Sequence, residues 1–302
     1  ATLWDALSQI GNVGDAMPVY YAGIIDAVRD EKKTVRTAMF TPNNIVANSL
    51  SIEYLFPNYD TPDHVIVEYV DGTTFQPAEV PCVLSGGTQL RPSRLKLFGC
   101  TDRNQAWRHG MRLAAANRDR RRNITLVTEM EGYIPRYGDL VAVSHDVPAW
   151  GMPGVVQSYS AGVVTTSEPL TWTAGQTHYM AFRKRDGSVD GPYTVTQGAD
   201  AFSAIVTGAP AIYVSDGASE EPTHYQFGPG ERRGLDCQVL GVHPKGDGQV
   251  EVTLVNYAPS VQDAELGGSA PPPPASSLLP GITDAPVVAS VSVTGTPKDG
   301  VL

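Results

Sequence analysis

Six histidines are the residues of this chain best suited to hold a metal ion or to transfer a proton. No two of them are three or four positions apart, the spacing that puts two ligands on one helix face; they are His64, His109, His145, His178, His224 and His243. Two have an acidic neighbour, Asp63 and Asp146, but adjacent residues of a strand point to opposite faces. The spacing therefore predicts no metal site.

Paired carboxylates could act as the acid and base of a glycosidase. Glu129 and Glu131 would share one face of a predicted strand, and Glu220 and Glu221 are adjacent in a polar loop. A solvated face or a turn explains either pair better than catalysis. We therefore expect no catalytic residue and no enzymatic activity.

Motifs that bind nucleotides or activate a nucleophile are absent from the sequence, among them G-x-x-x-x-G-K, G-x-S-x-G and H-E-x-x-H. The three cysteines, Cys82, Cys100 and Cys237, form no C-x-x-C pair. This spacing favours free, buried thiols over a zinc knuckle or a disulfide framework, and we expect no cofactor.

One basic segment stands out in a chain whose net charge is −10. Between Arg91 and Arg122 there are ten Lys or Arg and two Asp or Glu, so the segment carries +8 and the remainder −18. Its end holds the candidate partner-contact residues, Arg118, Arg120, Arg121 and Arg122. They either form a solvated helix end or bind an acidic partner or passing DNA. The overall charge argues against a protein that coats nucleic acid.

Two longer helices are expected, besides a short one that Thr41-Pro42 can start. The clearer one runs from Thr101, as N-cap, to about Arg122, with a stripe of small residues at helical spacing: Ala106, Gly110, Leu113, Ala114 and Asn117. A shorter amphipathic helix follows Thr2 and ends at Gly11.

From Asn123 onward, short apolar segments alternate with Gly, Pro or Asp-Gly turns about every 10 residues, a spacing typical of antiparallel barrels and sandwiches. Periodicity does not choose between the two. The fold class is therefore β-rich α+β with one prominent helix. A Pro-, Gly- and Ser-rich stretch then indicates a linker, and APVVASVSVTG indicates the first strand of a β-sandwich. No apolar run approaches the about 20 residues that span a bilayer.

Three stretches resemble a known family. They are AMFTPNNIVANSLSIEYLFPNYDTPDHVIVEYVDGTTFQP, then RLKLFGCTDRNQAWRHGMRLAAANRDRRRNITLVTEMEGYIPRYGDLVAVSHDVPAWG, and EPLTWTAGQTHYMAFRKRDGSVDGPYTVT. The G-x-T-D-x-x-x-A-x-R-x-G-x-R run in the second is the most specific part. Together they resemble the host-specificity, or tip attachment, proteins at the tail tip of long-tailed phages of the lambda type, over nearly all of residues 30 to 260.

The resemblance implies a structural central hub that closes the tail tube and organises the tail-tip proteins for host attachment and DNA delivery. It implies a homotrimer of β-barrel domains that binds other tail-tip and distal tail proteins, with the tape measure protein as a further candidate. The host surface receptor would be bound by regions outside this chain, and DNA would be contacted only during ejection. The protein would be assembled in the host cytoplasm and reside at the virion's tail tip.

Four regions are expected on this basis, in a chain that we take to be a piece of a longer protein. They are an N-terminal portion of a hub domain (1–95), a helix-bearing β-barrel hub region (96–262), a Pro/Gly/Ser-rich linker (263–281) and the truncated start of a fibronectin type III-like domain (282–302). Two other function classes stay open: a tail-associated cell-wall hydrolase, and a carbohydrate- or receptor-binding module.

Overall fold

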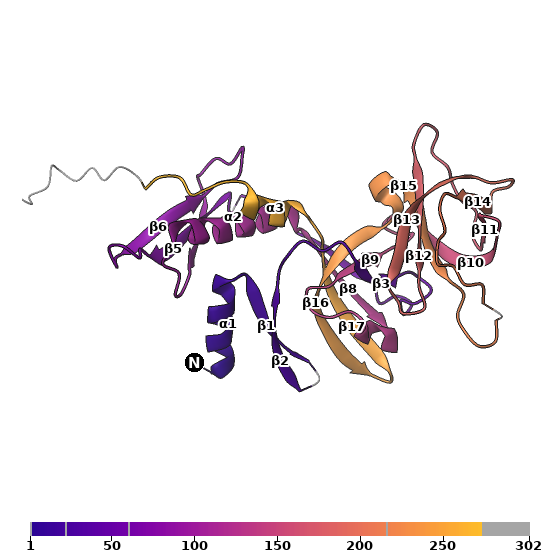
Figure 1. Ribbon diagram of the computed structural model, residues 1–302, viewed down its shortest axis with the longest axis horizontal. Coiled ribbons are helices and arrows are strands. Elements are labelled where there is room, and N and C mark those ends of the chain that lie inside the picture. The colour runs from indigo at the N-terminus through magenta and orange to yellow at the C-terminus, as the bar shows by residue number, and fades with distance from the viewer. Residues whose placement is uncertain (1, 22, 60, 216, 274–302) are drawn as a thin grey trace, which may run out of the picture. The chain divides into compact units, whose positions relative to one another are not determined.

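The computed structural model of the chain describes residues 2–21, 23–59, 61–215 and 217–273. The chain divides into two compact units, residues 1–270 and 271–302, and all the helices and strands below belong to the first (Figure 1). The predicted start of a fibronectin type III-like domain lies outside the described residues.

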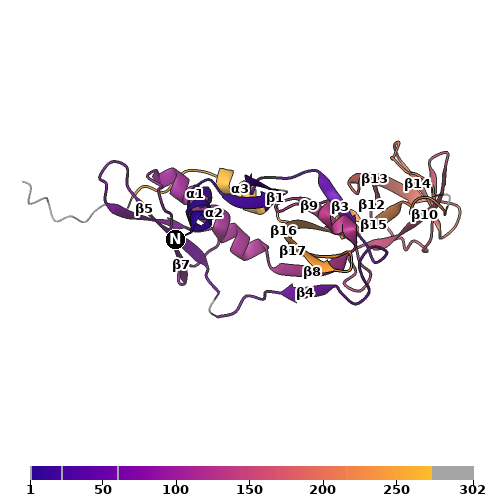
Figure 2. The same cartoon turned by 90° about the horizontal axis from the view of Figure 1, so that it is seen from below.

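A six-stranded sheet forms the middle of the first unit. Its order is β3 (Arg36–Phe40), β9 (Leu140–Val143), β16 (Leu235–Gly246), β17 (Gln249–Asn256), β8 (Arg122–Thr128) and β4 (Ser51–Tyr54). Only β3 and β9 pair in parallel. The apolar residues of its strands form one buried core, because short Val, Leu and Ile side chains fill a pleated surface well. The edge strands β3 and β4 lie on opposite sides of the sheet (Figure 2).

A closed six-stranded barrel is inserted between β9 and β16 of that sheet. Its order is β10 (Met152–Ser160), β11 (Val163–Thr166), β14 (Ser203–Val206), β13 (Val189–Gln197), β12 (His178–Arg183) and β15 (His224–Pro229), which pairs back with β10. All its pairings are antiparallel, and aromatic and aliphatic side chains fill its interior. The β-rich α+β fold class is confirmed, and the choice left open by the sequence falls on a barrel.

The chain segments that lead into and out of the barrel cross at close range. Gly151, just before β10, has φ +77, and a Cβ placed there would lie 2.0 Å from the carbonyl oxygen of Arg233. Arg233 ends the short 3-10 helix η2 (Gly230–Arg233) that follows β15. Only glycine meets both demands, a left-handed backbone and an absent side chain.

The long helix α2 (Arg103–Asp119) packs on a three-stranded sheet of order β6 (Pro77–Cys82), β5 (His64–Val70) and β7 (Pro92–Lys96). A Cβ on Gly110 would lie 2.3 Å from Cys82 Sγ, so the small residue lets the helix approach the sheet. Ala106, Gly110 and Ala114 of the predicted stripe are buried, Leu113 is half-buried, and Asn117 is exposed. All three cysteines are free and buried, as expected.

The ends of α2 differ from the sequence-based prediction. The N-cap is Asp102 rather than Thr101, because the Asp102 carboxylate accepts a hydrogen bond from the Gln105 N–H at 2.7 Å. The helix also ends three residues early, at Asp119. The backbone N–H groups of Arg121 and Arg122 instead donate to Asn256 Oδ1, both at 2.9 Å, and Arg122 begins β8.

The first helix α1 (Leu3–Val13) and the hairpin of β1 (Ala16–Tyr21) and β2 (Ile24–Arg29) form what we call the N-terminal arm (Figure 1). Thr2 and Asp5 make a capping box at the start of α1. The prediction that Gly11 ends this helix was wrong, since the helix continues for two residues. A Cβ on Gly11 would lie 2.6 Å from the Ala16 carbonyl oxygen, so the glycine makes room for β1.

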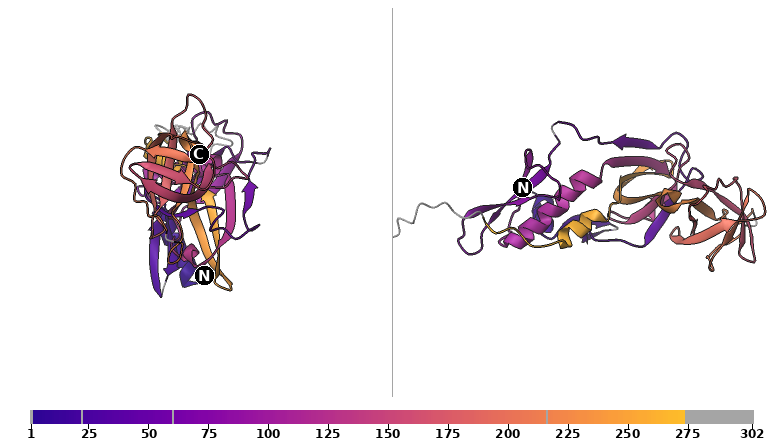
Figure 3. Two further views of the ribbon diagram at one scale, coloured as in Figure 1. Left: turned by 90° about the vertical axis from the view of Figure 1, so that its right-hand side faces the viewer. Right: turned by 90° about the horizontal axis from the view of Figure 1, so that it is seen from above.

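The last helix, α3 (Ser260–Leu266), lies beside α2 (Figure 3). It contains residues 263–266 of the predicted linker. The predicted boundaries at residues 95, 262 and 281 stay predictions, but the strand pairs of the six-stranded sheet join segments from both sides of residue 95. In the described part of the chain, no helix combines the length and apolar character that a membrane crossing needs.

Candidate partner-binding site

The described part of the chain leaves many apolar side chains of the N-terminal arm exposed to solvent. No residue of α1 is buried, and large apolar side chains are exposed along the arm: Leu3 (74%), Trp4, Ile10, Met17, Tyr20 (68%), Tyr21, Ile24 (68%) and Ile25. So many large exposed apolar side chains on one element indicate a site of protein contact. A two-stranded hairpin is also marginally stable in water without further packing.

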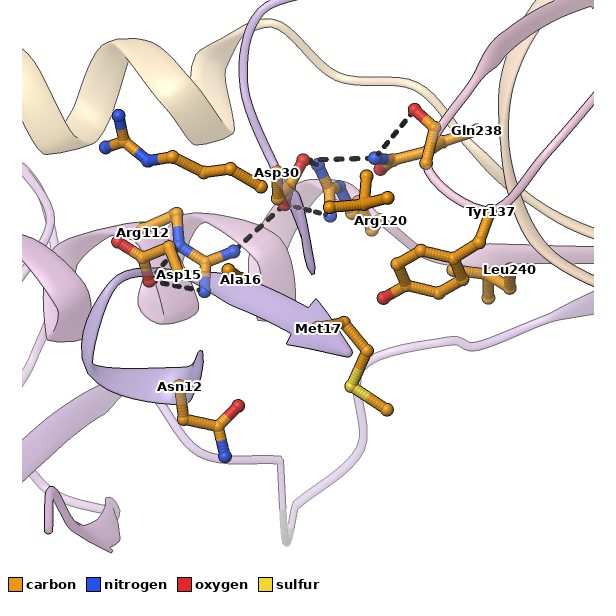
Figure 4. Close-up of a pocket in the computed structure, with 13 residues that line it drawn as sticks. Asn12, Asp15, Ala16, Met17, Asp30, Arg112, Arg120, Tyr137, Gln238 and Leu240 are labelled. Carbon is orange, nitrogen blue, oxygen red and sulfur yellow. Dashed lines mark hydrogen bonds and ion pairs between the residues drawn. The ribbon is translucent and has the colours of Figure 1, made fainter. Parts of the chain in front are cut away.

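Two aspartates hold this arm to the body of the unit. Asp15, in the turn between α1 and β1, lies 2.6 Å from His109 Nδ1 and accepts a hydrogen bond from Arg112 Nε at 2.7 Å. The Asp15 side chain is only 8% exposed and that of Arg112 11%. Figure 4 shows Asp15 and Arg112 in direct contact at the wall of a cavity that Tyr137 and Gln238 also line.

The second aspartate, Asp30, follows β2. Its carboxylate accepts hydrogen bonds from Arg112 at 2.9 Å, from both terminal nitrogens of Arg120 at 2.9 and 3.1 Å, and from the amide nitrogen of Gln238 at 3.1 Å (Figure 4). The amide nitrogen of Gln262 donates to it as well, at 2.9 Å. The arm is therefore tied at both ends of its hairpin to α2. We call Asp15, Asp30, His109, Arg112 and Arg120 the anchor network.

The anchor network keeps its carboxylates ionised. Burial opposes the charged form of Asp15, but the hydrogen bond to His109 and the charge of Arg112 outweigh it and lower the pKa of Asp15. Burial likewise opposes ionisation of Asp30, and the hydrogen bonds and charge of Arg120 prevail, so its pKa is also lowered.

Acid should therefore release the arm. A carboxyl group whose pKa is lower in the folded state stabilises the fold fully above its unfolded pKa of about 4, and this contribution is lost as pH falls through the folded value. We expect amides of β1 and β2 to lose protection between about pH 6 and about pH 3, measured by hydrogen exchange corrected for its intrinsic pH dependence. Strand β12 of the barrel is the internal control. An arm that keeps its protection at the lower pH would contradict this role of the anchor network.

The four candidate arginines have different environments. Arg120 is 13% exposed and belongs to the anchor network, whereas Arg118 is 53% exposed and pairs with Asp119 at 2.7 Å. Arg121 donates to the carbonyl oxygen of Leu55 at 3.1 Å. The guanidinium of Arg122 lies 5.9 Å from the centre of the Tyr54 ring. Arg121 and Arg122 thus contact one stretch of chain, which begins at the last residue of β4 and continues beyond it.

That surface, which we call the aromatic ledge, consists of Tyr54, Leu55, Phe56 and Tyr59. Their exposed fractions are 44%, 43%, 79% and 87%. The rings of Tyr54 and Phe56 stack with centroids 6.1 Å apart. Arg91, at the other end of the basic segment, lies over Tyr59 at 5.4 Å and donates to its carbonyl oxygen. Guanidinium groups therefore lie over the first and the last ring of the ledge.

The carboxylate pairs considered for catalysis are separated in the fold. Glu129 and Glu131 do not share a strand, because Glu131 lies in the short 3-10 helix η1 (Met130–Tyr133). One member of each pair, Glu131 and Glu221, instead contacts the same guanidinium, that of Arg183. The guanidinium offsets one of the two negative charges, and its contact with Glu131 ties the barrel to η1. Glu220 pairs with Arg185 at 2.7 Å.

His64 and His145 lie 2.6 and 2.8 Å from the carboxylates of their neighbours Asp63 and Asp146, so the expectation that these adjacent side chains point to opposite faces was wrong. His224 lies 3.2 Å from the Thr41 hydroxyl, and burial, together with nearby Arg183, lowers its pKa to about 4. His178 stacks on Phe227 in the barrel. Among the residues that the structure describes, no three His, Cys, Asp or Glu side chains are grouped as metal ligands.

Sequence reasoning missed the anchor network and the exposure of the arm. The one available signal was the spacing of His109 and Arg112, three residues apart on the predicted helix and therefore on one face. Their partners Asp15 and Asp30 are 94 and 82 residues away along the chain, and no local pattern indicates them.

Comparison with known proteins adds a family. A family model described as "Putative phage tail protein" matches residues 3–155. The fold is similar to a chain in the virion of a native gene transfer agent particle (11% identity, TM-score 0.46, covering 84% of this chain and 39% of that one). It is also similar to the tail protein from Neisseria meningitidis MC58 (13% identity, TM-score 0.42, covering 87% and 57%). This chain thus spans less than two thirds of either structure's chain. No curated protein matches it.

Proposed function

The chain belongs to this family of phage tail proteins, and from that premise we propose that it is a structural, non-enzymatic part of a tail-tip hub. In this role three copies surround the axis of the tail and close the distal end of its tube. Their barrels and sheets bind the other tail-tip and distal tail proteins. The tape measure protein is a candidate partner on the tube side.

The observation that carries the proposal is the N-terminal arm, an apolar element that a buried anchor network holds in place and that the described part of the chain leaves exposed. A catalytic protein needs a site that collects reactive groups, whereas the groups collected here are ion pairs that fix one element against another. Such an arrangement suits a protein whose work is to hold neighbours in position. The closed barrel supports it further, because a closed barrel leaves no sheet edge free to pair at random.

The remaining features of the hub follow as part of the proposal. A linker near 263–281 would lead to fibronectin type III-like domains, and receptor binding would lie in regions beyond this chain. DNA would pass the hub only during ejection. Assembly in the host cytoplasm agrees with three free thiols, since disulfides are rare in that compartment.

A reconstruction of the intact tail end tests the hub role directly. A closed tube end lies on a symmetry axis, so a protein that closes it must repeat around that axis through head-to-tail contacts. We expect density for three copies of this fold at the tip. One copy, six copies, or a position along the tail shaft would overturn the assignment.

A further inference from the structure

We propose that the N-terminal arm of one copy docks on the aromatic ledge of a second copy of this chain. The contact would be head-to-tail, with the arm always the donor and the ledge always the acceptor. This inference rests on the proposed hub and deepens it by naming the two surfaces that join its subunits.

Chemistry makes the two surfaces complementary. The arm offers Leu, Ile, Trp and Tyr side chains together with two solvent-exposed carboxylates, Asp5 and Asp26. The ledge offers three exposed aromatic rings, and guanidinium groups lie over two of them, Arg122 over Tyr54 and Arg91 over Tyr59. A third guanidinium, that of Arg121, binds the carbonyl oxygen of Leu55. Apolar groups would meet apolar groups, and acidic groups would meet basic ones at the rim, the arrangement found in specific interfaces.

Charge also argues against the simplest alternative, in which two arms pack on each other. A two-fold contact between arms would bring Asp5 and Asp26 of both copies to one interface. Like charges placed together cost free energy and suppress a wrong pairing. The ledge carries the opposite charge, although the acidic Glu53 precedes it and accepts a hydrogen bond from Asn123 at 3.2 Å.

The topology connects the N-terminal arm and the aromatic ledge to opposite edges of the six-stranded sheet, as a ring of subunits requires. The arm leads through residues 30–35 into β3, the strand at one edge of the six-stranded sheet. The ledge begins where β4 ends, at the other edge. Figure 2 shows these two edge strands on opposite sides of the sheet. Different surfaces on opposite sides of one subunit produce a heterologous contact, and a heterologous contact whose rotation closes produces a ring.

The surface exposed on each side fits an interface of this kind. Eight large apolar side chains of the arm and four of the ledge are exposed in the isolated chain. Trp and Tyr dominate the binding energy of many interfaces, and the arm has one Trp and two Tyr while the ledge has two Tyr and a Phe. The anchor network pre-organises the arm, which lowers the entropy lost when it binds.

Cross-linking between separately labelled copies tests the contact on the full 302-residue chain. One preparation carries Ile24→Cys in the arm and the other Phe56→Cys in the ledge; the native thiols are buried, and burial raises the pKa of Cys82 to about 12. Mixed with a short bismaleimide, the two should give a covalent dimer. Phe75→Cys, 75% exposed at the turn after β5, is the matched control partner and should give none.

A charge variant separates specific docking from apolar stickiness. Asp26→Lys in the Ile24→Cys chain should lower the cross-linked yield several-fold, because a lysine would face the arginines of the ledge. Glu129→Lys, which reverses an exposed acid outside both surfaces, should leave the yield unchanged. Equal losses from the two variants would count against the ledge as the acceptor.

The outcomes also separate this inference from the hub itself. Cross-links between two arms carrying Ile24→Cys, equal yields with Phe75→Cys, or no cross-link between arm and ledge would overturn the docking. If the tail end nevertheless showed three copies, the hub assignment would stand and only the joining surfaces would be wrong.

Discussion

Replacing Gly151 with alanine should destabilise the protein by about 3 kcal/mol more than replacing Gly175 with alanine. Both glycines have similar left-handed backbones, with φ +77 and +75. A Cβ costs about 1–2 kcal/mol in that conformation wherever it stands. At Gly175 it would meet nothing within 4 Å, whereas at Gly151 it would lie 2.0 Å from a backbone carbonyl oxygen. The additional loss of stability in Gly151→Ala would come from the steric clash where the segments that lead into and out of the barrel cross. Such overpacking costs about 1–3 kcal/mol or more.

Urea denaturation of the two variants and the parent checks this comparison. The midpoint for Gly175→Ala should fall slightly, and that for Gly151→Ala much further. Tyrosine and tryptophan fluorescence would report on the barrel, where Trp172 packs on Phe227 with ring centroids 4.9 Å apart. Equal shifts in the two variants would show that the crossing is loose and that the chain simply moves aside.

Asp30→Ala should cost about 3–5 kcal/mol and release the arm, the second large effect expected from this structure. The substitution leaves two guanidiniums, those of Arg112 and Arg120, without their shared carboxylate; their side chains are 11% and 13% exposed. Arg112 keeps its ion pair with Asp15, whereas Arg120 has no second carboxylate among the described contacts. Removing the partner of such a buried charge is costly because the charge is left without compensation. The cost should appear in chemical denaturation, together with rapid proteolysis after the arm, at residues 31–35.

The control is an ion pair of the same length at the surface. Lys245 and Glu251 lie 2.8 Å apart, and their side chains are 52% and 33% exposed. Glu251→Ala should cost less than about 1 kcal/mol, as is usual for solvated pairs. An equally small effect of Asp30→Ala would show that the anchor network does not stabilise the folded state.

The sequence was most informative where structure is local. The strands HYMAFR and QVEVTLVN and the helix of the basic segment follow from side-chain period, turn residues and capping, all of which act within a few residues. The same rules could not assign strands to sheets. QVEVTLVN pairs with β8, more than 100 residues earlier, although the barrel strands lie between them in the chain. The side-chain periodicity of this strand would be the same in the barrel and in the six-stranded sheet, so only its tertiary pairing distinguishes the two.

Sequence patterns had a similar limit at the candidate site. The basic segment was recognised by composition, but composition does not separate Arg120, which is buried against Asp30, from Arg118, which is solvated. That distinction depends on an acid 90 residues away along the chain. The apolar residues at the start of the arm were predicted as one face of an amphipathic helix. A sequence pattern predicts that an apolar face will be covered, and it does not say whether the cover comes from the same chain.

The insertion of the barrel also sets an order of events during synthesis. Strands β8 and β9 leave the ribosome before the barrel, and their neighbours β16 and β17 leave after it. At about 5–20 residues per second, the whole barrel is made while the six-stranded sheet is still incomplete. All the pairings of the barrel lie within residues 152–229, so it can close before β16 and β17 are made. The six-stranded sheet can be completed only afterwards. Until β16 and β17 are made, the apolar strands β8 and β9 each lack one of their neighbours in the sheet.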